Sequence, residues 1–72
     1  HTGAQFKLGL LDLELYNYPQ AIAWLEKAAN QSNLEAQIHL GILYANGIGV
    51  QQDDGEAFFW FKKAALQGDA IS

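Results

Sequence analysis

The sequence contains no cysteine and no arginine, and its four basic residues are all lysines. Without cysteine, both disulfide bonds and thiolate metal sites are excluded. The eight acidic residues outnumber the lysines and give a net charge of −4, whereas a domain that binds nucleic acid normally has a basic face. No stretch approaches the roughly 18 consecutive apolar residues that a membrane-spanning helix requires. We therefore expect neither a nucleic-acid partner nor a membrane span.

The chain is also short, and a domain of 72 residues has little interior. A chain of this size buries only about 60% of the surface that its unfolded form exposes. Many small domains compensate with disulfides or metal ions. Here apolar side chains, which belong to half of the residues, must supply the stability by packing. The sequence begins with histidine rather than methionine, so we expect it to be an excerpt or a processed piece of a longer chain.

An internal repeat accounts for most of the chain. The segment AQFKLGLL at Ala4–Leu11 matches AQIHLGIL at Ala36–Leu43, which lies 32 positions later. The segment AIAWLEKAANQSN at Ala21–Asn33 matches AFFWFKKAALQGD at Ala57–Asp69, which lies 36 positions later. The second copy is therefore the longer one between its matching segments. Such a repeat indicates an architecture in which similar units stack on one another.

Each matching segment has the spacing of an amphipathic helix, because apolar residues recur every three or four positions, as at Phe6, Leu10 and Leu13. The predicted fold is all-α: an α/α superhelix, or solenoid, of two helix-turn-helix repeats with four antiparallel helices. Residues 1–72 form one repeat segment, with the first repeat at 3–33 and the second at 34–69. The four helices are expected at roughly Gly3–Leu15, Tyr18–Gln31, Leu34–Asn46 and Asp54–Gln67.

Residues at the expected helix ends have capping chemistry. Asn33 can cap the third helix through its side chain, and Asp53 and Asn17 each begin a pattern that resembles a capping box. We expect Gly47 and Gly68 to end the third and fourth helices. The first hairpin should turn near residues 16–17 and the second between residues 46 and 52.

Two glycines recur in the middle of helices, where glycine costs roughly 1 kcal/mol relative to alanine. Gly9 and Gly41 occupy the same position in the two copies. We interpret them as places where the paired helix approaches closely, near Leu25 and Phe61 respectively.

The loop before the fourth helix also contains two glycines, in the segment GIGV at Gly47–Val50. A glycine-rich turn in front of a helix can bind phosphate, but such a loop usually follows a strand, and here a helix precedes it. Carboxylates open the next helix and would repel an anion, and no basic residue lies between Gly41 and Phe61. We interpret the glycines as turn residues, with Val50 packed into the hairpin.

The second copy resembles a Sel-one-like repeat (SLR), a relative of the tetratricopeptide repeat with a longer loop between its helices. The resemblance depends on the pattern A-x-x-x-LG-x-x-Y-x-x-G-x-GV-x-x-D followed by A-x-x-W-x-x-KAA-x-QG, between Ala36 and Gly68. The first copy keeps the LG, A-x-x-W and KAA elements but lacks the G-x-GV loop, and Asp12 replaces the tyrosine. With its shorter loop it is similar to an ordinary tetratricopeptide repeat.

No set of residues predicts catalysis, since no hydroxyl group stands at helical spacing from a histidine with a supporting acid. Asp53, Asp54 and Glu56 could be read as a carboxylate pair or a metal site, but a capped first turn of a helix explains them. His39 aligns with Lys7, which indicates a solvated position, and no second histidine or cysteine stands at ligand spacing. We expect no catalytic residue, no cofactor and no metal, and thus no enzyme.

The aromatic run at Phe58–Phe61 admits two interpretations. Four successive residues of a helix point all round its axis, so packing on both sides within a stack is the default expectation. Alternatively, part of this surface is an exposed docking patch or is covered by a helix outside the segment.

The resemblance implies a function in protein interaction. In tetratricopeptide-like repeats the first helix of each hairpin lines a concave surface that binds partners, and here that surface would suit an apolar peptide or helix. The alternative is that the same residues only pack against one another. The residues expected to bind a partner are Phe6, Leu10, Leu13, Glu14, Ile38, Ile42, Ala45 and Asn46.

We therefore predict a non-catalytic adaptor or scaffold module whose partner is a protein or peptide. The resemblance implies roles in signalling, protein quality control and bacterial envelope or host-interaction processes. The alternative function is a regulatory or localising subunit of a bacterial envelope or cell-wall enzyme. Both the bacterial periplasm and the cytoplasm stay open as compartments.

Solenoids need about three or more repeats for stability, and only two are present here. We expect the segment to belong to a longer array, or isolated copies to associate through the last helix, because an exposed aromatic side chain forgoes about 1.5–3 kcal/mol of burial. The residues of the last helix concerned are Phe58, Phe59, Phe61 and Leu66.

Overall fold

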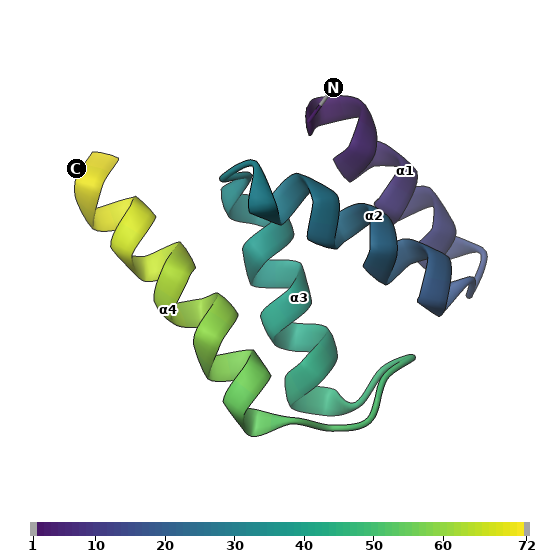
Figure 1. Ribbon diagram of the computed structural model, residues 1–72. Helices are drawn as coiled ribbons and strands as arrows, with labels where there is room; N and C mark the ends of the chain where they lie inside the picture. The colour runs from purple at the N-terminus through teal and green to yellow at the C-terminus, as the bar shows by residue number, and fades with distance from the viewer. Residues whose placement is uncertain (1, 72) are drawn as a thin grey trace.

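The computed structural model describes residues 2–71, which contain four α-helices and no strand. The helices are α1 (Thr2–Glu14), α2 (Tyr18–Asn30), α3 (Leu34–Asn46) and α4 (Asp54–Ile71). This confirms the all-α prediction, and the bounds of α1 to α3 lie within one residue of those expected from the sequence. Figure 1 shows the four helices in chain order across the molecule, with α1 and α4 at opposite sides.

The helices form two antiparallel hairpins, α1 with α2 and α3 with α4, and the hairpins are joined where α2 packs against α3. The body measures 34 × 28 × 15 Å along its principal axes, so it is a thin slab. A body this thin has a narrow core and two large solvent-facing sides. Each helix therefore contributes side chains both to the core and to the surface.

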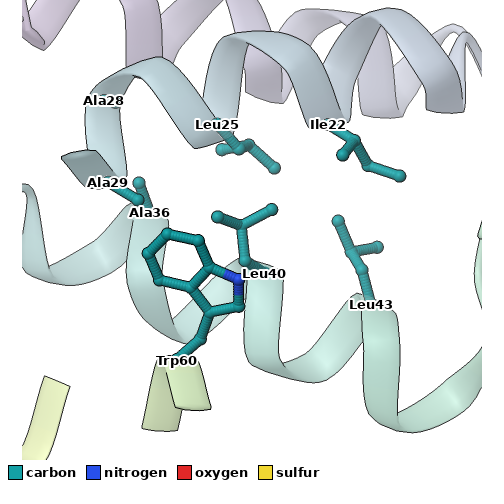
Figure 2. Close-up of a cluster of buried hydrophobic side chains, with 8 residues drawn as sticks. All are labelled: Ile22, Leu25, Ala28, Ala29, Ala36, Leu40, Leu43 and Trp60. Atoms are coloured by element: carbon teal, nitrogen blue, oxygen red, sulfur yellow. The ribbon is translucent and has the colours of Figure 1, made fainter. Parts of the chain in front are cut away.

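The core lies at the junction of the two hairpins. Leu25 of α2 and Leu40 of α3 are the largest fully buried side chains, and Figure 2 shows them pointing toward each other, with Trp60 of α4 beside them. α1 adds the half-buried side chains of Phe6 and Leu13 to this packing. The buried cluster consists of Ile22, Leu25, Ala28, Ala29, Ala36, Leu40, Leu43 and Trp60.

Two of the three expected side-chain caps at helix N-termini are present. The Asn33 side chain accepts a hydrogen bond from the backbone N–H of Ala36 at 2.9 Å, and Asp53 Oδ1 accepts one from the backbone N–H of Glu56 at 3.0 Å. Asn17 makes no such side-chain bond, so the prediction of a capping box there is wrong. Its backbone carbonyl instead accepts from the N–H of Ala21 at 2.9 Å, the first bond of α2.

The two hairpin turns are confirmed at their predicted positions. At the first turn Tyr16 has φ 61°, and the N–H of Asn17 donates to the carbonyl of Asp12 at 2.8 Å. This closes α1 with a left-handed residue, an unusual role for a tyrosine. At the second turn Gly47 takes the left-handed conformation with φ 65°.

The prediction that Gly68 ends the last helix is wrong, because α4 continues through it to Ile71. In the first copy the aligned residue, Ser32, has φ 68° and turns the chain from α2 into α3. At Gly68 the backbone stays helical and the glycine is not used as a cap.

The mid-helix glycines mark close helix approach, as predicted. A Cβ atom added at Gly9 would lie 3.0 Å from the Leu25 side chain, and one added at Gly41 would lie 2.6 Å from the Phe61 ring. The two hairpins therefore use the same device, in which a side chain of the second helix lies directly on the backbone of the first.

The aromatic residues Phe58–Phe61 were expected by default to pack on both sides of the helix, and the structure confirms this for only some of them. Trp60 is buried, and Phe61 lies on Gly41 although it stays partly exposed. Phe58 and Phe59 are exposed, so the expectation that they pack in the core is wrong. The reason is that, among the described residues, α4 packs mainly against α3 and has no helix on its other side.

We expect Gly41→Leu to destabilise the fold by about 1–3 kcal/mol, the usual cost of overpacking, because the new side chain must displace the Phe61 ring. A matched control is Gly68→Leu, since nothing lies within 4 Å of a Cβ atom at that helical position. Thermal or urea unfolding followed by circular dichroism would measure both changes. A Gly41→Leu chain as stable as the wild type would contradict the close-approach argument.

The caps allow a second comparison within one chain. Asn33→Ala should lower the free energy of unfolding by about 1 kcal/mol, because it removes the bond to the N–H of Ala36. Asn17→Ala should change it by less than about 0.5 kcal/mol, since no side-chain bond is lost. Equal effects of the two substitutions in urea unfolding would show that the Asn33 bond does not stabilise the fold.

Candidate functional site

The residues expected to bind a partner form two short rows on α1 and α3, which we call the α1/α3 stripe. The four residues on α3 lie 32 positions after the four on α1, so both helices carry the same positions of the repeat. On a helix these positions share one face, because they are spaced by three or four residues. The stripe consists of Phe6, Leu10, Leu13, Glu14, Ile38, Ile42, Ala45 and Asn46.

The two rows differ in exposure. Ile38 and Ile42 on α3 are 37% and 44% exposed, so two aliphatic side chains one turn apart are open to solvent. Phe6 and Leu13 on α1 are half-buried against the core cluster, and Leu10 is also half-buried. The α1 row therefore supports the hairpin as well as forming surface, whereas the α3 row has exposed apolar area.

His39 lies between the two rows, and its contact with Phe6 could not be seen in the sequence. Its ring meets the ring of Phe6 edge-on, with 5.5 Å between centroids and 77° between planes. Its Nδ1 lies 2.8 Å from the carbonyl oxygen of Glu35, to which it donates when protonated. The residue is half-buried and its hydrogen bond to Glu35 is exposed, so the position is at the surface but less solvated than its alignment with Lys7 suggested. Its contact with Phe6 joins α1 to α3 along the stripe.

The polar end of the α3 row is held by its own hydrogen bonds. Asn46 Nδ2 donates to the carbonyl of Ile42 at 2.9 Å, and Gln52 Nε2 donates to the carbonyl of Ala45 at 2.9 Å. The bond from Gln52 satisfies a carbonyl of the last turn of α3, which has no partner within the helix, and the bond from Asn46 adds a second donor to the carbonyl of Ile42. The stripe thus ends in an ordered amide pair next to the loop.

The glycine loop folds back against the first hairpin rather than presenting its backbone to an anion. Gly49 has φ 73°, and a Cβ atom there would collide with the side chain of Tyr18 at the start of α2. Ile48 and Val50 pack against the core cluster, as predicted for Val50. In Figure 1 the loop reaches under α3 toward the first hairpin. The loop therefore anchors the two repeats to each other.

The phenol of Tyr44 on α3 has a raised pKa. Burial raises the pKa of its phenol above the ordinary value, and the negative charges of Glu26, Glu56 and Asp53 raise that pKa further. The hydroxyl therefore stays protonated at physiological pH and remains a hydrogen-bond donor. It lies on the side of α3 that carries the core rather than in the stripe.

A second surface feature is a hollow of about 260 Å³ between the α2–α3 turn and α4. Gln37 borders it with a buried side chain whose Nε2 donates to the carbonyl of Ala29 at 3.1 Å. Its Oε1 has no hydrogen-bond partner within residues 2–71. Gln67 ties α4 to the turn by donating to the carbonyl of Ser32 at 2.6 Å. Amide and apolar groups and the Lys63 side chain line the hollow, and no carboxylate side chain is among its lining residues.

Among residues 3–68, whose side chains the structure describes, no three histidine or acidic side chains come close enough together to hold a metal ion. Over the same range no helix has both the length and the hydropathy of a membrane span. The most distinctive surface of the described chain is thus its exposed apolar area, which lies on α1 and the first turn, on the α3 row and on α4.

Comparison with known proteins identifies the repeat. The model of the Sel1 repeat matches residues 2–33 and again residues 34–69. No solved structure matches the chain.

Three relatives illustrate the range of proteins that contain similar repeats. The chain is 43% identical over 53 residues to the Sel1-repeat-containing protein YjcO of Escherichia coli, an alignment that covers 68% of this chain and 23% of that protein. It is 34% identical over 70 residues to DAP3-binding cell death enhancer 1 of Rattus norvegicus, covering 94% of this chain and 14% of that protein. It is 38% identical over 50 residues to the chitin synthase regulator SKT5 of Malassezia restricta, covering 69% of this chain and 4% of that protein.

The chain spans less than a quarter of the length of each of these relatives. The family is nevertheless shown by the two repeat matches, which together cover residues 2–69. Repeats of this kind generally act as protein-interaction modules. The paired helices, the glycine loop and these matches together show that the chain belongs to the Sel1 repeat family.

Proposed function

We propose that this chain is a non-catalytic adaptor module that binds an apolar peptide or helix of a partner protein along the α1/α3 stripe. The observation that supports it is the exposure of Ile38 and Ile42 on α3, beside the Phe6–His39 contact with α1. An apolar row on a rigid helix suits an amphipathic segment, which buries one side chain for each turn it shares with the row.

The negative charge around the stripe suggests which residues flank the apolar segment of the partner. Glu14 and Glu35 are exposed beside the row, and the chain as a whole has a net charge of −4. Basic residues on either side of the apolar segment would therefore speed its association and orient it. Most of the affinity would come from burying the two isoleucines, because exposed ion pairs contribute little.

A second candidate function is regulation or localisation of an enzyme that builds the cell wall or envelope, with this chain as a binding segment of the regulator. It is favoured by two relatives that are named as regulators of chitin synthase, one from Malassezia restricta and one from Schizosaccharomyces pombe. The two candidates share the same binding surface and differ only in the protein that is bound.

The stripe can be tested with peptides selected for binding to the 72-residue chain from a library of amphipathic helical sequences. The variant Ile38→Asp/Ile42→Asp should bind the selected peptides about ten- to hundredfold more weakly. This range corresponds to losing about 1.5–3 kcal/mol of apolar burial. Fluorescence anisotropy of labelled peptide would measure the dissociation constant.

The control is Leu66→Asp, which places a negative charge on an exposed leucine of α4, outside the stripe. It should leave peptide affinity unchanged. The proposal fails if the selected peptides bind the stripe variant as tightly as the wild type, or if only the α4 variant weakens binding.

A further inference from the structure

The helix backbone sets the hydrogen-bonding roles of the His39 ring on α3. Its Nδ1 lies 2.8 Å from the carbonyl oxygen of Glu35, one turn earlier in the helix. A carbonyl oxygen accepts hydrogen bonds and never donates them, so Nδ1 carries the proton of the neutral ring. The hydrogen bond made by one ring nitrogen decides the state of the other. The second nitrogen, Nε2, is therefore a hydrogen-bond acceptor.

Nε2 has no hydrogen-bond partner among residues 3–68, whose side chains the structure describes. Within that range the ring bonds to Glu35 through Nδ1 and meets Phe6 of α1 edge-on, and a phenyl ring has no polar atom. Over the same residues Gln37 Oε1 is the single buried side-chain polar atom that lacks a hydrogen bond. The unpaired Nε2 is therefore open to solvent.

This acceptor lies in an apolar setting on the α1/α3 stripe. His39 touches Phe6 of the α1 row and stands next to Ile38 of the α3 row, with Ile42 one turn further on. A partner segment that covers both rows therefore covers His39 as well. A polar group that loses its water on binding and gains no hydrogen bond weakens the complex. The side chains of Phe6, Ile38 and Ile42 have no donor, so the partner must supply one.

We propose that the partner segment carries an uncharged hydrogen-bond donor, a hydroxyl or an indole N–H, in the middle of its apolar face, and that this donor binds Nε2 of His39. The inference rests on the proposed function and adds a specificity-determining residue to the stripe. The two isoleucines accept any apolar side chain that fits them. His39 distinguishes a segment that has a donor at one position from a segment that lacks it.

The groups near His39 argue against charged partners for Nε2. A carboxylate would meet the lone pair of Nε2 and the negative charge of the exposed Glu35, and both would repel it. A lysine ammonium can donate, but it has three N–H groups where Nε2 offers one acceptor, and a buried charge without full pairing is costly. A hydroxyl or an indole has one donor hydrogen, which matches one acceptor. Basic side chains of the partner suit the exposed Glu14 and Glu35 at the margin of the stripe instead.

The tautomer of His39 can be measured without any partner. Nitrogen NMR of the 72-residue chain in mildly alkaline solution should show a proton on Nδ1 of His39 and none on Nε2. The spectrum of the His39→Phe variant assigns the signal, because it lacks this ring. A neutral ring with its proton on Nε2 would overturn the proposal, since Nε2 would then be a donor.

The donor itself can be tested with peptides selected for binding to the stripe. In a selected peptide the donor is replaced by a side chain of the same shape that has none, threonine by valine or tryptophan by naphthylalanine. This replacement should weaken binding to the wild type about tenfold, because Nε2 is left buried and unpaired. It should leave binding to His39→Phe unchanged, since a phenyl ring keeps an edge toward Phe6 but has no acceptor.

A second variant and a control separate this role from a merely structural one. His39→Lys introduces the residue type of the aligned Lys7, which has donors but no acceptor, and it should bind the donor peptide about tenfold more weakly than the wild type. The same replacement at a solvent-facing position of the peptide should leave its affinity unchanged. Circular dichroism checks that each variant is folded.

Two binding results would overturn the inference. In the first, the selected peptides have no donor on their apolar face. In the second, removing the donor weakens binding to the wild type and to His39→Phe equally, so that the donor binds elsewhere. If either occurs while binding still requires Ile38 and Ile42, the proposed function stands and only this inference fails. If the selected peptides bind Ile38→Asp/Ile42→Asp as tightly as the wild type, both fail.

Discussion

Leu25 and Leu40 meet where α2 packs against α3, and both are fully buried. This contact joins two hairpins that would otherwise each have an apolar side in water. An isolated pair of helices of this length is marginal, because most helical stability in proteins comes from tertiary packing. The contact also sets the relative placement of α1 and α3, and with it the geometry of the α1/α3 stripe.

Each leucine is buried from two directions, and this explains how the repeat propagates. Leu25 lies on the backbone of α1 at Gly9 and faces Leu40 on its other side. Phe61 lies in the same way on Gly41 but has no residue covering its other side within the described chain. One interface thus explains both the core of the molecule and the exposed apolar area on α4.

The glycine loop has a mechanical role in this arrangement. Gly49 lies against Tyr18 of the first hairpin, while Asp53 caps α4. The loop therefore contacts the first repeat and starts the last helix, so it holds both hairpins in register. A larger residue at position 49 would meet Tyr18 and would also have to adopt φ 73°, which side chains other than glycine rarely do.

Much of the fold could be predicted because it depends on local chemistry repeated twice. Helical spacing, Asn33 and Asp53 as caps, and the paired glycines Gly9 and Gly41 each have a physical meaning that is visible in the sequence. The failures were at Asn17 and Gly68, where a residue with capping chemistry is present but the backbone does not use it. A cap depends on the path of the next segment, which local sequence does not describe.

For the candidate site too, part could be predicted from the sequence and part depended on the tertiary structure. The sequence determined the helices, their pairing and the positions that share a helix face, because these follow from a 3.6-residue period and from repeat identity. Only the tertiary structure decided which of those positions are covered. Phe6 and Ile38 are aligned, yet one is half-buried and the other exposed, and His39 is drawn against Phe6 although its aligned residue is a lysine. Burial depends on which helix lies next to a residue, and two identical faces differ when only one of them has a neighbour.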